Sequence, residues 1–349
     1  MLTKLKIGHF RCFDHFEATF TPGLNLILGP NAHGKTSLLE AACVLLRLQS
    51  PRTNRLREII KHHARGLLVD GHYAGKHLQF YYSEHRKKLA LDSVEQRTGT
   101  EYLKTGHVIW FSNTDIDLIR DSGERRRHFL DFIASQAIPE YRRALRDYTR
   151  AIRSRNLLLK SPVSKWREIC AFDAPLIAAG NILTEARHEL TTALRPLAQL
   201  AHSAISGCAE HLDTHYISGS TQNFTEALAA ARMEDTRLRQ TTVGPHRDDW
   251  ELTLGGHPAT LASEGQQRTL ALSLRLASAR FLEAHFGEPP LLLLDDIFGE
   301  LDLTRRTALL RELPTNAQQL VTTTQLEWLP LGIDAHILQL GPKPSPEIS

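Results

Sequence analysis

Gly29-Pro30-Asn31-Ala32-His33-Gly34-Lys35-Thr36, near the start of a chain of 349 residues, matches the phosphate-loop pattern G-x-x-x-x-G-K-[ST] at every fixed position. Residues 24–28 precede it and predict a short buried strand. After it, apolar residues recur with helical spacing from Leu38 to Leu46. Glycines let the backbone fold around phosphate oxygens, so that successive N–H groups and the helix N-terminus point at an anion. The sequence therefore predicts a strand, a phosphate-binding loop and a helix.

This loop is expected to supply most of the contacts to a nucleotide. We expect the Lys35 ammonium to reach the β- and γ-phosphates and the Thr36 hydroxyl to bind Mg²⁺. The alternative is a glycine-rich turn that holds no nucleotide, and the flanking strand and helix argue against it. The predicted nucleotide-binding residues here are Gly29, Pro30, Asn31, Ala32, His33, Gly34, Lys35, Thr36 and Ser37.

Two carboxylates follow an apolar run near the other end of the chain. Leu291 to Leu294 come after Pro289-Pro290 and predict a strand that is buried on both faces. Because a carboxylate is costly to hold beside such a strand without a cation, we expect Asp295 to hold Mg²⁺ through its water shell. We expect Asp296 to orient or deprotonate an attacking water. The alternative, a pair of solvated aspartates, is disfavoured by the complete phosphate loop, so ATP and Mg²⁺ are the expected cofactors.

The segment between these two halves indicates the superfamily. Lys35 and Asp295 are 260 positions apart, more than an ordinary domain of about 100–150 residues, so one core must be assembled from both chain ends around an insertion. Before the apolar strand, residues 263–266 open a helix with a hydroxyl, a glycine and a glutamine, which predicts a second anion-binding surface. Residues 299–302 and 321–324 follow. This order of phosphate loop, insertion, signature, metal-binding strand, D-loop and switch is the layout of an ABC-type ATPase head.

Within that superfamily the chain resembles the RecF family of bacterial DNA repair ATPases, which are related to SMC-type heads, over nearly its whole length. The motifs that carry the resemblance occur in family order and are Phe10-Arg11-Cys12-Phe13, Pro22-Gly23-Leu24-Asn25, Trp110-Phe111-Ser112, Glu124-Arg125-Arg126-Arg127-His128-Phe129-Leu130-Asp131, Gly244-Pro245-His246-Arg247-Asp248-Asp249 and Leu294-Asp295-Asp296-Ile297-Phe298-Gly299-Glu300-Leu301-Asp302. The chain departs from the family pattern at two sites. Ala32-His33 replaces the small and amide residues expected in the loop, and Asn113-Thr114 stands where the family usually has a proline and an acid. Transporter relatives carry Glu at the position of Asp296, whereas RecF-like proteins share the Asp.

The resemblance implies an ATPase that dimerises head to head around two ATP molecules on duplex or gapped DNA and is released by slow hydrolysis. It also implies recombinational repair and replication-fork maintenance, recombinase loading through recombination mediator proteins, and a preference for junctions between single and double strands. Beyond the loop, it implies ATP contacts from the partner's Ser263, Gly265, Gln266 and Asp302. It implies metal ligation by Thr36 and Asp295, and catalytic roles for Asp296, Lys35 and Thr324.

The expected fold is α/β: an ABC-type P-loop ATPase head assembled from both chain ends, an antiparallel β subdomain and an inserted α-helical arm. We expect the head in residues 1–115 and 236–349 and the arm in 116–235. The antiparallel sheet is predicted from β-rich runs at 66–69, 77–82, 88–91 and 107–111. Two apolar stripes, over 141–152 and 182–200, flank a break around Ser161-Pro162 and predict an antiparallel helical pair.

Positive charge is concentrated in the first helical stretch. Residues 116–160 contain 11 Lys and Arg against six Asp and Glu, a net of +5 where the whole chain carries +3. A cationic helix face predicts contact with the phosphate backbone of DNA without base readout, and the alternative is a solvated face with intrahelical ion pairs. We find no helix-turn-helix or zinc-finger signature, so sequence-specific binding is not expected. The predicted DNA-binding residues are Arg125, Arg126, Arg127, Arg143 and Arg150.

Composition predicts a globular cytoplasmic protein. Hydrophobic residues make up 42% of the chain and charged residues 23%, and no run approaches the roughly 18 apolar residues of a membrane span. The N-terminus lacks the core of a signal peptide. The four cysteines have no C-x-x-C spacing, so neither zinc nor a disulfide framework is indicated. We therefore expect no membrane partner.

Three other functions remain open. A transporter ATPase subunit would need a membrane partner and would not carry the Arg125-Arg126-Arg127 motif. Another SMC-like DNA-associated ATPase, or a nuclease ATPase, would need long coiled-coil heptads or an added nuclease domain, and we expect neither in 349 residues. A nucleotide-dependent scaffold without turnover would be separated by measuring ATP hydrolysis with and without DNA.

Overall fold

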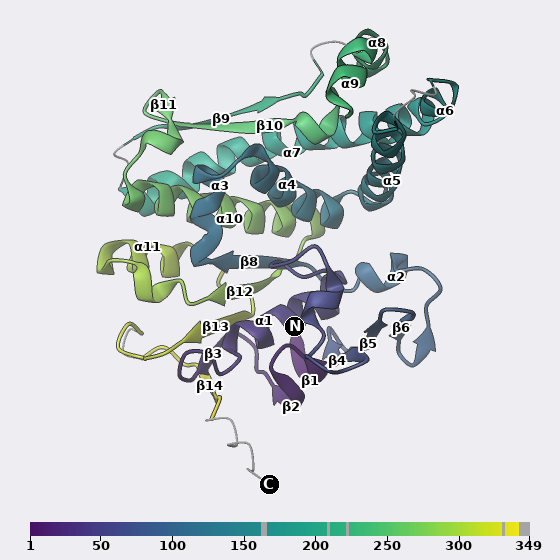
Figure 1. The fold of residues 1–349 in the computed structure, drawn as a ribbon. Helices are drawn as coiled ribbons and strands as arrows, with labels where there is room; N and C mark the ends of the chain where they lie inside the picture. The colour runs from purple at the N-terminus through teal and green to yellow at the C-terminus, as the bar shows by residue number, and fades with distance from the viewer. Residues whose placement is uncertain (162–165, 208–209, 221–222, 330–331, 342–349) are drawn as a thin grey trace. The chain divides into compact units, whose positions relative to one another are not determined.

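The computed structural model describes residues 1–161, 166–207, 210–220, 223–329 and 332–341. These residues form two compact units, which are described separately (Figure 1). Unit 1 joins Met1–Thr114 to Leu282–Ser349, and unit 2 is the intervening segment Asp115–Phe281. The first unit is therefore assembled from both ends of the chain.

A five-stranded parallel sheet forms the centre of unit 1. In sheet order its strands are β14 (His336–Gln339), β3 (Leu24–Leu28), β13 (Gln319–Thr323), β12 (Leu291–Asp295) and β8 (Val108–Ser112). The first four residues of β12 are buried leucines, as is typical of a parallel strand that is covered on both faces. Helix α1 (Lys35–Arg47) contacts β8, β12 and β13. The strand, loop and helix predicted around the phosphate loop, and the strand predicted before Asp295, all form.

Unit 1 also contains a six-stranded antiparallel sheet. In sheet order its strands are β2 (Phe13–Thr19), β1 (Leu2–Phe10), β4 (Gly66–Tyr73), β5 (Lys76–Ser83), β6 (Lys87–Leu91) and β7 (Val94–Glu95). Helix α1 contacts β1, β4 and β5 as well as the parallel sheet, which explains why 12 of its residues are buried. Three of the four predicted β-rich runs lie in this sheet. The fourth, 107–111, was wrong in this respect: it forms β8 of the parallel sheet, because its side chains are buried on both faces.

The remaining elements of unit 1 are short. They are η1 (Leu56–Ile59), α2 (Thr100–Leu103), η5 (Phe298–Glu300) and α11 (Leu303–Glu312), while η2 (Asn113–Ile116) begins directly after β8. Asp302 caps α11, since its Oδ1 accepts a hydrogen bond from the Arg305 N–H at 2.8 Å.

Unit 2 is mainly helical. Its helices are α3 (Asp117–Arg120), α4 (Gly123–Ala137), α5 (Tyr141–Leu159), α6 (Trp166–Cys170), α7 (Asp173–Ser206), α8 (Phe224–Ala230), α9 (Arg232–Leu238), η3 (Pro245–Arg247), η4 (Ala259–Leu261) and most of α10 (Glu264–Phe286). A three-stranded antiparallel sheet accompanies them, in the order β11 (His257–Pro258), β10 (Asp249–Leu254), β9 (Leu212–Ile217).

Helices α5 and α7 form the predicted antiparallel pair. Tyr141, at the start of α5, contacts Arg187 in α7, whereas Arg155, near the end of α5, contacts Asp173 at the start of α7. The apolar stripe predicted for α7 is only partly buried, since Leu200 is 63% exposed. Of the predicted break at Ser161-Pro162, the second residue lies outside the described residues.

The second boundary of the helical unit differs from the expected one. The expected arm ended at residue 235, whereas unit 2 continues to Phe281. The segment beyond 235 joins this unit because β10 pairs with β9, and because Arg126 of α4 forms an ion pair with Asp249 of β10. Strand β9 also interrupts the stretch that was expected to be helical.

Among the described residues, one helical segment, Trp166–Ser206, is long and apolar enough to cross a membrane by length and composition alone, since an 18-residue window within it has a mean hydropathy of 1.2. Core helices of soluble proteins pass the same test, so one such helix is weak evidence. Helix α7, which makes up most of it, contains the buried Arg187, paired with Asp131 and Asp248.

Candidate functional site

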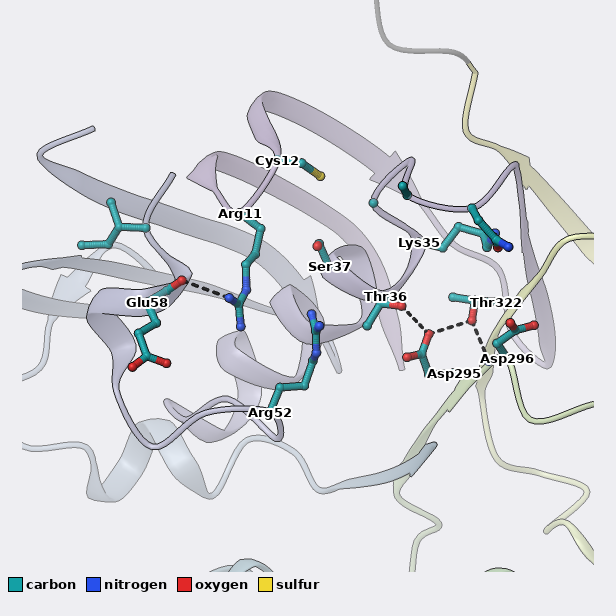
Figure 2. A pocket seen from close by; sticks show the side chains of 14 residues that line it. Arg11, Cys12, Lys35, Thr36, Ser37, Arg52, Glu58, Asp295, Asp296 and Thr322 are labelled. Atoms are coloured by element: carbon teal, nitrogen blue, oxygen red, sulfur yellow. Dashed lines mark hydrogen bonds between the residues drawn. The ribbon is translucent and has the colours of Figure 1, made fainter. Parts of the chain in front are cut away.

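One pocket of about 530 Å³ in unit 1 brings together residues from both chain ends (Figure 2). The N-terminal part contributes Arg11, Arg52 and most of residues 31–37, and the C-terminal part contributes Asp295, Asp296 and Thr322. Parallel strands place their carboxyl ends at one edge of a sheet, which explains why the ends of β3, β12 and β13 meet here.

The phosphate loop has the backbone that its glycines allow. Ala32 and Gly34 both have left-handed φ angles, of 66° and 96°. A Cβ on Gly34 would lie 2.7 Å from Cys12 Sγ, and one on Gly29 would lie 2.8 Å from the Leu340 carbonyl oxygen. Larger residues would therefore collide at both fixed glycines. Gly34 immediately precedes α1, so the loop delivers the N-terminus of that helix to the pocket.

The Lys35 side chain lies back over the loop from which it comes. Its Nζ donates to the carbonyl oxygens of Gly29 at 2.5 Å and Pro30 at 3.1 Å, and to Asn31 Oδ1 at 3.5 Å. Burial lowers the pKa of the Lys35 ammonium, while the charges of Asp296 and Asp295 raise it. The loop thus holds a largely buried cation at the pocket wall.

A hydroxyl from one chain end and a carboxylate from the other meet in the pocket. Thr36 Oγ1 donates to Asp295 Oδ1 at 2.8 Å, and Thr322 Oγ1 donates to the same oxygen at 2.9 Å (Figure 2). Burial raises the pKa of Asp295, and the two hydroxyls lower it. Hydroxyl and carboxylate oxygens are the ligands that Mg²⁺ prefers, and a cation would stabilise this partly buried carboxylate. The residues present therefore fit a magnesium ion.

Asp296 also lines the pocket, but it is hydrogen-bonded through its backbone, whereas Asp295 is bound through its carboxylate. Its φ of 52° is left-handed. Its N–H donates to Thr322 Oγ1 at 2.9 Å, and its carbonyl oxygen accepts from Asn113 Nδ2 at 3.0 Å. Burial raises the pKa of the Asp296 carboxyl, while Lys35 lowers it and Glu300 raises it further. A carboxylate whose pKa is raised in this way is suited to accept a proton.

The switch strand contacts the aspartates through Thr322, which the sequence reasoning missed. Thr322 is paired with Asp295 in the register of β13 and β12, whereas the predicted Thr324 is exposed and lies after the end of β13. The sequence offered one signal for Thr322. Two apolar runs, 291–294 and 320–321, each end in polar residues, and these polar residues are adjacent when the two strands pair. The neighbouring Thr323 accepts a hydrogen bond from Trp328 Nε1 at 2.9 Å.

The other predicted nucleotide contacts are not among the residues that line the pocket. Among the described residues, Ser263, Gly265, Gln266 and Asp302 do not line it, and neither do Gly29, Pro30 and His33 of the loop. At the start of α10, the Ser263 N–H donates to Gln266 Oε1 at 2.7 Å, and the Gln266 N–H donates to Ser263 Oγ at 3.4 Å. This reciprocal pair is a capping box, and Ser263 is exposed.

The predicted DNA-binding arginines divide into two groups. Arg126 binds both carboxylate oxygens of Asp249, at 2.7 and 2.9 Å, and only 14% of its side chain is exposed. Arg127 donates to the Asp248 carbonyl oxygen at 2.6 Å, and burial lowers its pKa. These two side chains hold α4 against β10. Arg125 is 55% exposed and pairs with acids of its own region.

Exposed cations follow one face of α5. Those at positions 143, 146, 150, 153 and 160 are all exposed, and their spacing of three, four, three and seven residues keeps them on one side of a helix. Arg143 and Arg146 share the half-exposed Asp147. Arg155 lies off this face and is fully buried between Asp173 and Asp235. We call the five exposed cations the α5 row: Arg143, Arg146, Arg150, Arg153 and Lys160.

Comparison with known proteins identifies the family. The family model described as the RecF/RecN/SMC N terminal domain matches residues 1–332. The curated "DNA replication and repair protein RecF" of Rippkaea orientalis (strain PCC 8801 / RF-1) is 34% identical over 367 residues, covering 97% of this chain and 96% of that protein.

Solved structures agree with this assignment. A structure of the recombination mediator protein RecF-ATP in the RecFOR pathway has a TM-score of 0.85 at 28% identity, covering 95% of this chain and 93% of that chain. An Smc head domain with an extended coiled coil from Pyrococcus furiosus, bound to the C-terminal domain of ScpA, has a TM-score of 0.51 at 16% identity and covers 93% of this chain and 89% of that chain, so it shows the fold alone. The chain belongs to the RecF family and has the fold of an ABC-type, SMC-like ATPase head.

Proposed function

We propose that this protein is a DNA-binding ATPase of recombinational repair and replication-fork maintenance. The observation that carries the proposal is the convergence of Lys35, Thr36, Asp295 and Asp296 in one pocket, although they come from opposite ends of the chain. A related RecF has been solved with ATP, and curated relatives are named DNA replication and repair proteins.

The pocket residues have distinct roles in this proposal. The Lys35 ammonium and the N–H groups of the loop bind the β- and γ-phosphates. Thr36 and Asp295 hold Mg²⁺, which when bound would neutralise charge that develops on the phosphate oxygens. Asp296 accepts a proton from the attacking water.

A second copy of the chain completes the site. The signature residues Ser263, Gly265 and Gln266 lie at the start of a 23-residue helix whose first N–H groups favour an anion. We assign these residues, together with Asp302, to the γ-phosphate of ATP held by the partner subunit. ATP then joins two heads, and hydrolysis separates them.

The α5 row supplies the contact with DNA. It runs 17 positions along the chain, from Arg143 to Lys160 at the C-cap of α5, or about 26 Å. Cationic side chains that contact phosphates do not distinguish one base from another, so binding is to the phosphate backbone and is not sequence-specific. Arg125 also remains a candidate for this contact, whereas the contacts of Arg126 and Arg127 assign them to the fold of unit 2.

The biological setting follows from the family. We infer that the dimer binds duplex or gapped DNA, including junctions between single and double strands, in the cytoplasm. Recombination mediator proteins are the expected partners that load the recombinase.

Two measurements on the same preparations test this function. Sedimentation velocity with ATP, ADP or no nucleotide, each with and without a gapped duplex, should show a dimer only with ATP and its retention on DNA. ATP hydrolysis should be slow and faster with DNA. A monomer in every nucleotide state would contradict the composite site, and dimerisation without hydrolysis would favour a scaffold.

A further inference from the structure

The backbone of Asp296 is held on both sides by side chains from the strands next to its own. Its N–H donates to Thr322 Oγ1 at 2.9 Å, and its carbonyl oxygen accepts from Asn113 Nδ2 at 3.0 Å. Asp296 directly follows β12, the strand that lies between β13 and β8 in the sheet. Thr322 belongs to β13, and Asn113 directly follows β8. The register explains this geometry, because Asp295 is paired with Thr322 on one side and with Ser112 on the other.

The conformation held in this way is one that side chains disfavour. Asp296 has a φ of 52°, in the left-handed region where non-glycine residues are uncommon. Residues in this region persist where the surrounding structure over-determines them, and they cluster at active sites. Both polar groups of the Asp296 backbone are engaged by side chains, so its orientation is set by two neighbouring strands.

Asn113 contacts Asp296 but is not part of the pocket lining. Among the described residues, Asp296 and Thr322 line the pocket and Asn113 does not. The Asn113 side-chain amide donates to a backbone oxygen, a contact that needs a hydrogen-bond donor and that a carboxylate could not make. Thr322 differs, because its hydroxyl also donates to the proposed magnesium ligand Asp295.

The geometry points to Asn113 as a positioning residue that fixes the Asp296 carboxylate where it meets the attacking water. This inference rests on the proposed function, since it presumes that Asp296 is the base. Loss of the amide releases the Asp296 carbonyl and lets the chain after β12 leave the left-handed conformation. The carboxylate then spends less time where it could orient the attacking water, while the groups that bind ATP are unchanged.

The test compares Asn113→Ala and Asn113→Asp with Thr114→Ala. Thr114 is the neighbouring exposed residue, and its hydroxyl contacts Ser112 Oγ at 2.7 Å. In both Asn113 variants kcat should fall by up to about 10²-fold, the effect of a small misplacement of a catalytic group. ATP affinity, measured by titration calorimetry, should stay at the parent value. Thr114→Ala should keep the parent kcat.

A double-mutant cycle separates positioning from a direct role. If Asn113 acts through the Asp296 carboxylate, Asn113→Ala should cause no further loss of kcat in an Asp296→Asn background. If the two losses multiply, Asn113 has a direct role on the water or the metal, and the inference is overturned.

Two further outcomes are distinguishable. Unchanged kcat in Asn113→Asp, in a protein that folds and binds ATP as the parent does, overturns the positioning role but leaves the proposed function standing. Absence of hydrolysis in the parent, or an Asp296→Asn variant as active as the parent, overturns the proposed function itself and the inference with it.

Discussion

Thr36 and Asp295, 259 positions apart in the chain, are joined by a hydrogen bond of 2.8 Å between the threonine Oγ1 and the aspartate Oδ1. The threonine is the second residue of α1 and the aspartate is the last residue of β12. This contact exists only when both chain ends are folded together, so the pocket forms only when unit 1 is assembled. It also places two oxygens side by side, where the proposed magnesium ion would bind.

Thr36→Val should therefore reduce the magnesium dependence of ATP binding. The substitution keeps the shape of the side chain but removes the hydroxyl ligand. We expect affinity for ATP with Mg²⁺ to fall by at least about 10-fold, because losing even an outer-shell partner of a metal ligand typically costs about 10- to 100-fold. Affinity in EDTA should change little. Calorimetric titration in both conditions measures this, with Thr36→Ser as the control that keeps a hydroxyl; equal losses in Mg²⁺ and EDTA would contradict the metal role.

Lys35→Ala should abolish most ATP binding and leave the fold intact. Hydrogen bonds to charged groups contribute about 1.5–3 kcal/mol each, so losing the ammonium should weaken binding by at least about 10²-fold. The partners of Lys35 are oxygens of its own loop, so thermal unfolding without nucleotide should be nearly unchanged. Direct titration with ATP is the measurement. Equal affinity in the variant and the parent would rule out this site.

The sequence predicted the centre of the pocket well because short-range patterns determine it. The loop, α1 and the apolar β12 are local features, and their chemistry is carried by fixed residue types. Local patterns could not show that Thr322, and not Thr324, contacts the aspartates. It depended on the register between β13 and β12, which the order of residues within either strand does not reveal.

Long-range pairing also explains the differences in unit 2. The charge excess of residues 116–160 predicts an exposed cationic face. However, Arg126 and Arg155 are held by Asp249 and Asp235, acids that lie outside that stretch and were invisible to a local count. Long-range pairing also explains why unit 2 ends at residue 281 and not at the expected residue 235. Strands β9 and β10, which lie on either side of residue 235, pair with each other.

Ser263→Arg should separate ATP binding from dimerisation. The substitution places a bulky cation at an exposed helix start in unit 2, and the residues that line the pocket are in unit 1. ATP should bind one subunit with parent affinity, while the ATP-dependent dimer and hydrolysis are lost. Ser263→Thr keeps the capping hydroxyl and serves as the control. A Ser263→Arg protein that still dimerises with ATP in sedimentation velocity would contradict the composite site.

Arg155→Ala should destabilise the fold much more than Arg153→Ala, although the two residues are only two positions apart in α5. Arg155 is fully buried and paired with Asp235 at 2.7 Å, so its removal leaves a buried acid and should cost about 3–5 kcal/mol in the free energy of unfolding. Arg153 is exposed, and its removal should change stability by less than about 0.5 kcal/mol.

DNA binding should show the reverse pattern for this pair. Arg153→Ala should reduce the slope of log affinity against log salt by about 1, as expected for one lost phosphate contact. Urea unfolding and a salt series of DNA titrations measure the two properties. An unchanged salt slope in Arg153→Ala, and in the other single variants of the α5 row, would remove this face of α5 from the DNA contact.

Asp296→Asn should trap the protein on DNA. The amide keeps the size of the side chain but cannot accept the proton of water, and general-base assistance is worth about 10²–10⁴ in rate. Thr36 and Asp295 remain in place, so ATP binding and dimerisation should survive. The variant should therefore persist as an ATP-bound dimer that dissociates from DNA more slowly than the parent. Dissociation of both proteins from a gapped duplex in ATP, measured across a salt series, tests this. Since backbone contacts release counterions, added salt should accelerate release in both and preserve their ratio. If Asp296→Asn leaves DNA as fast as the parent, hydrolysis at Asp296 does not time release.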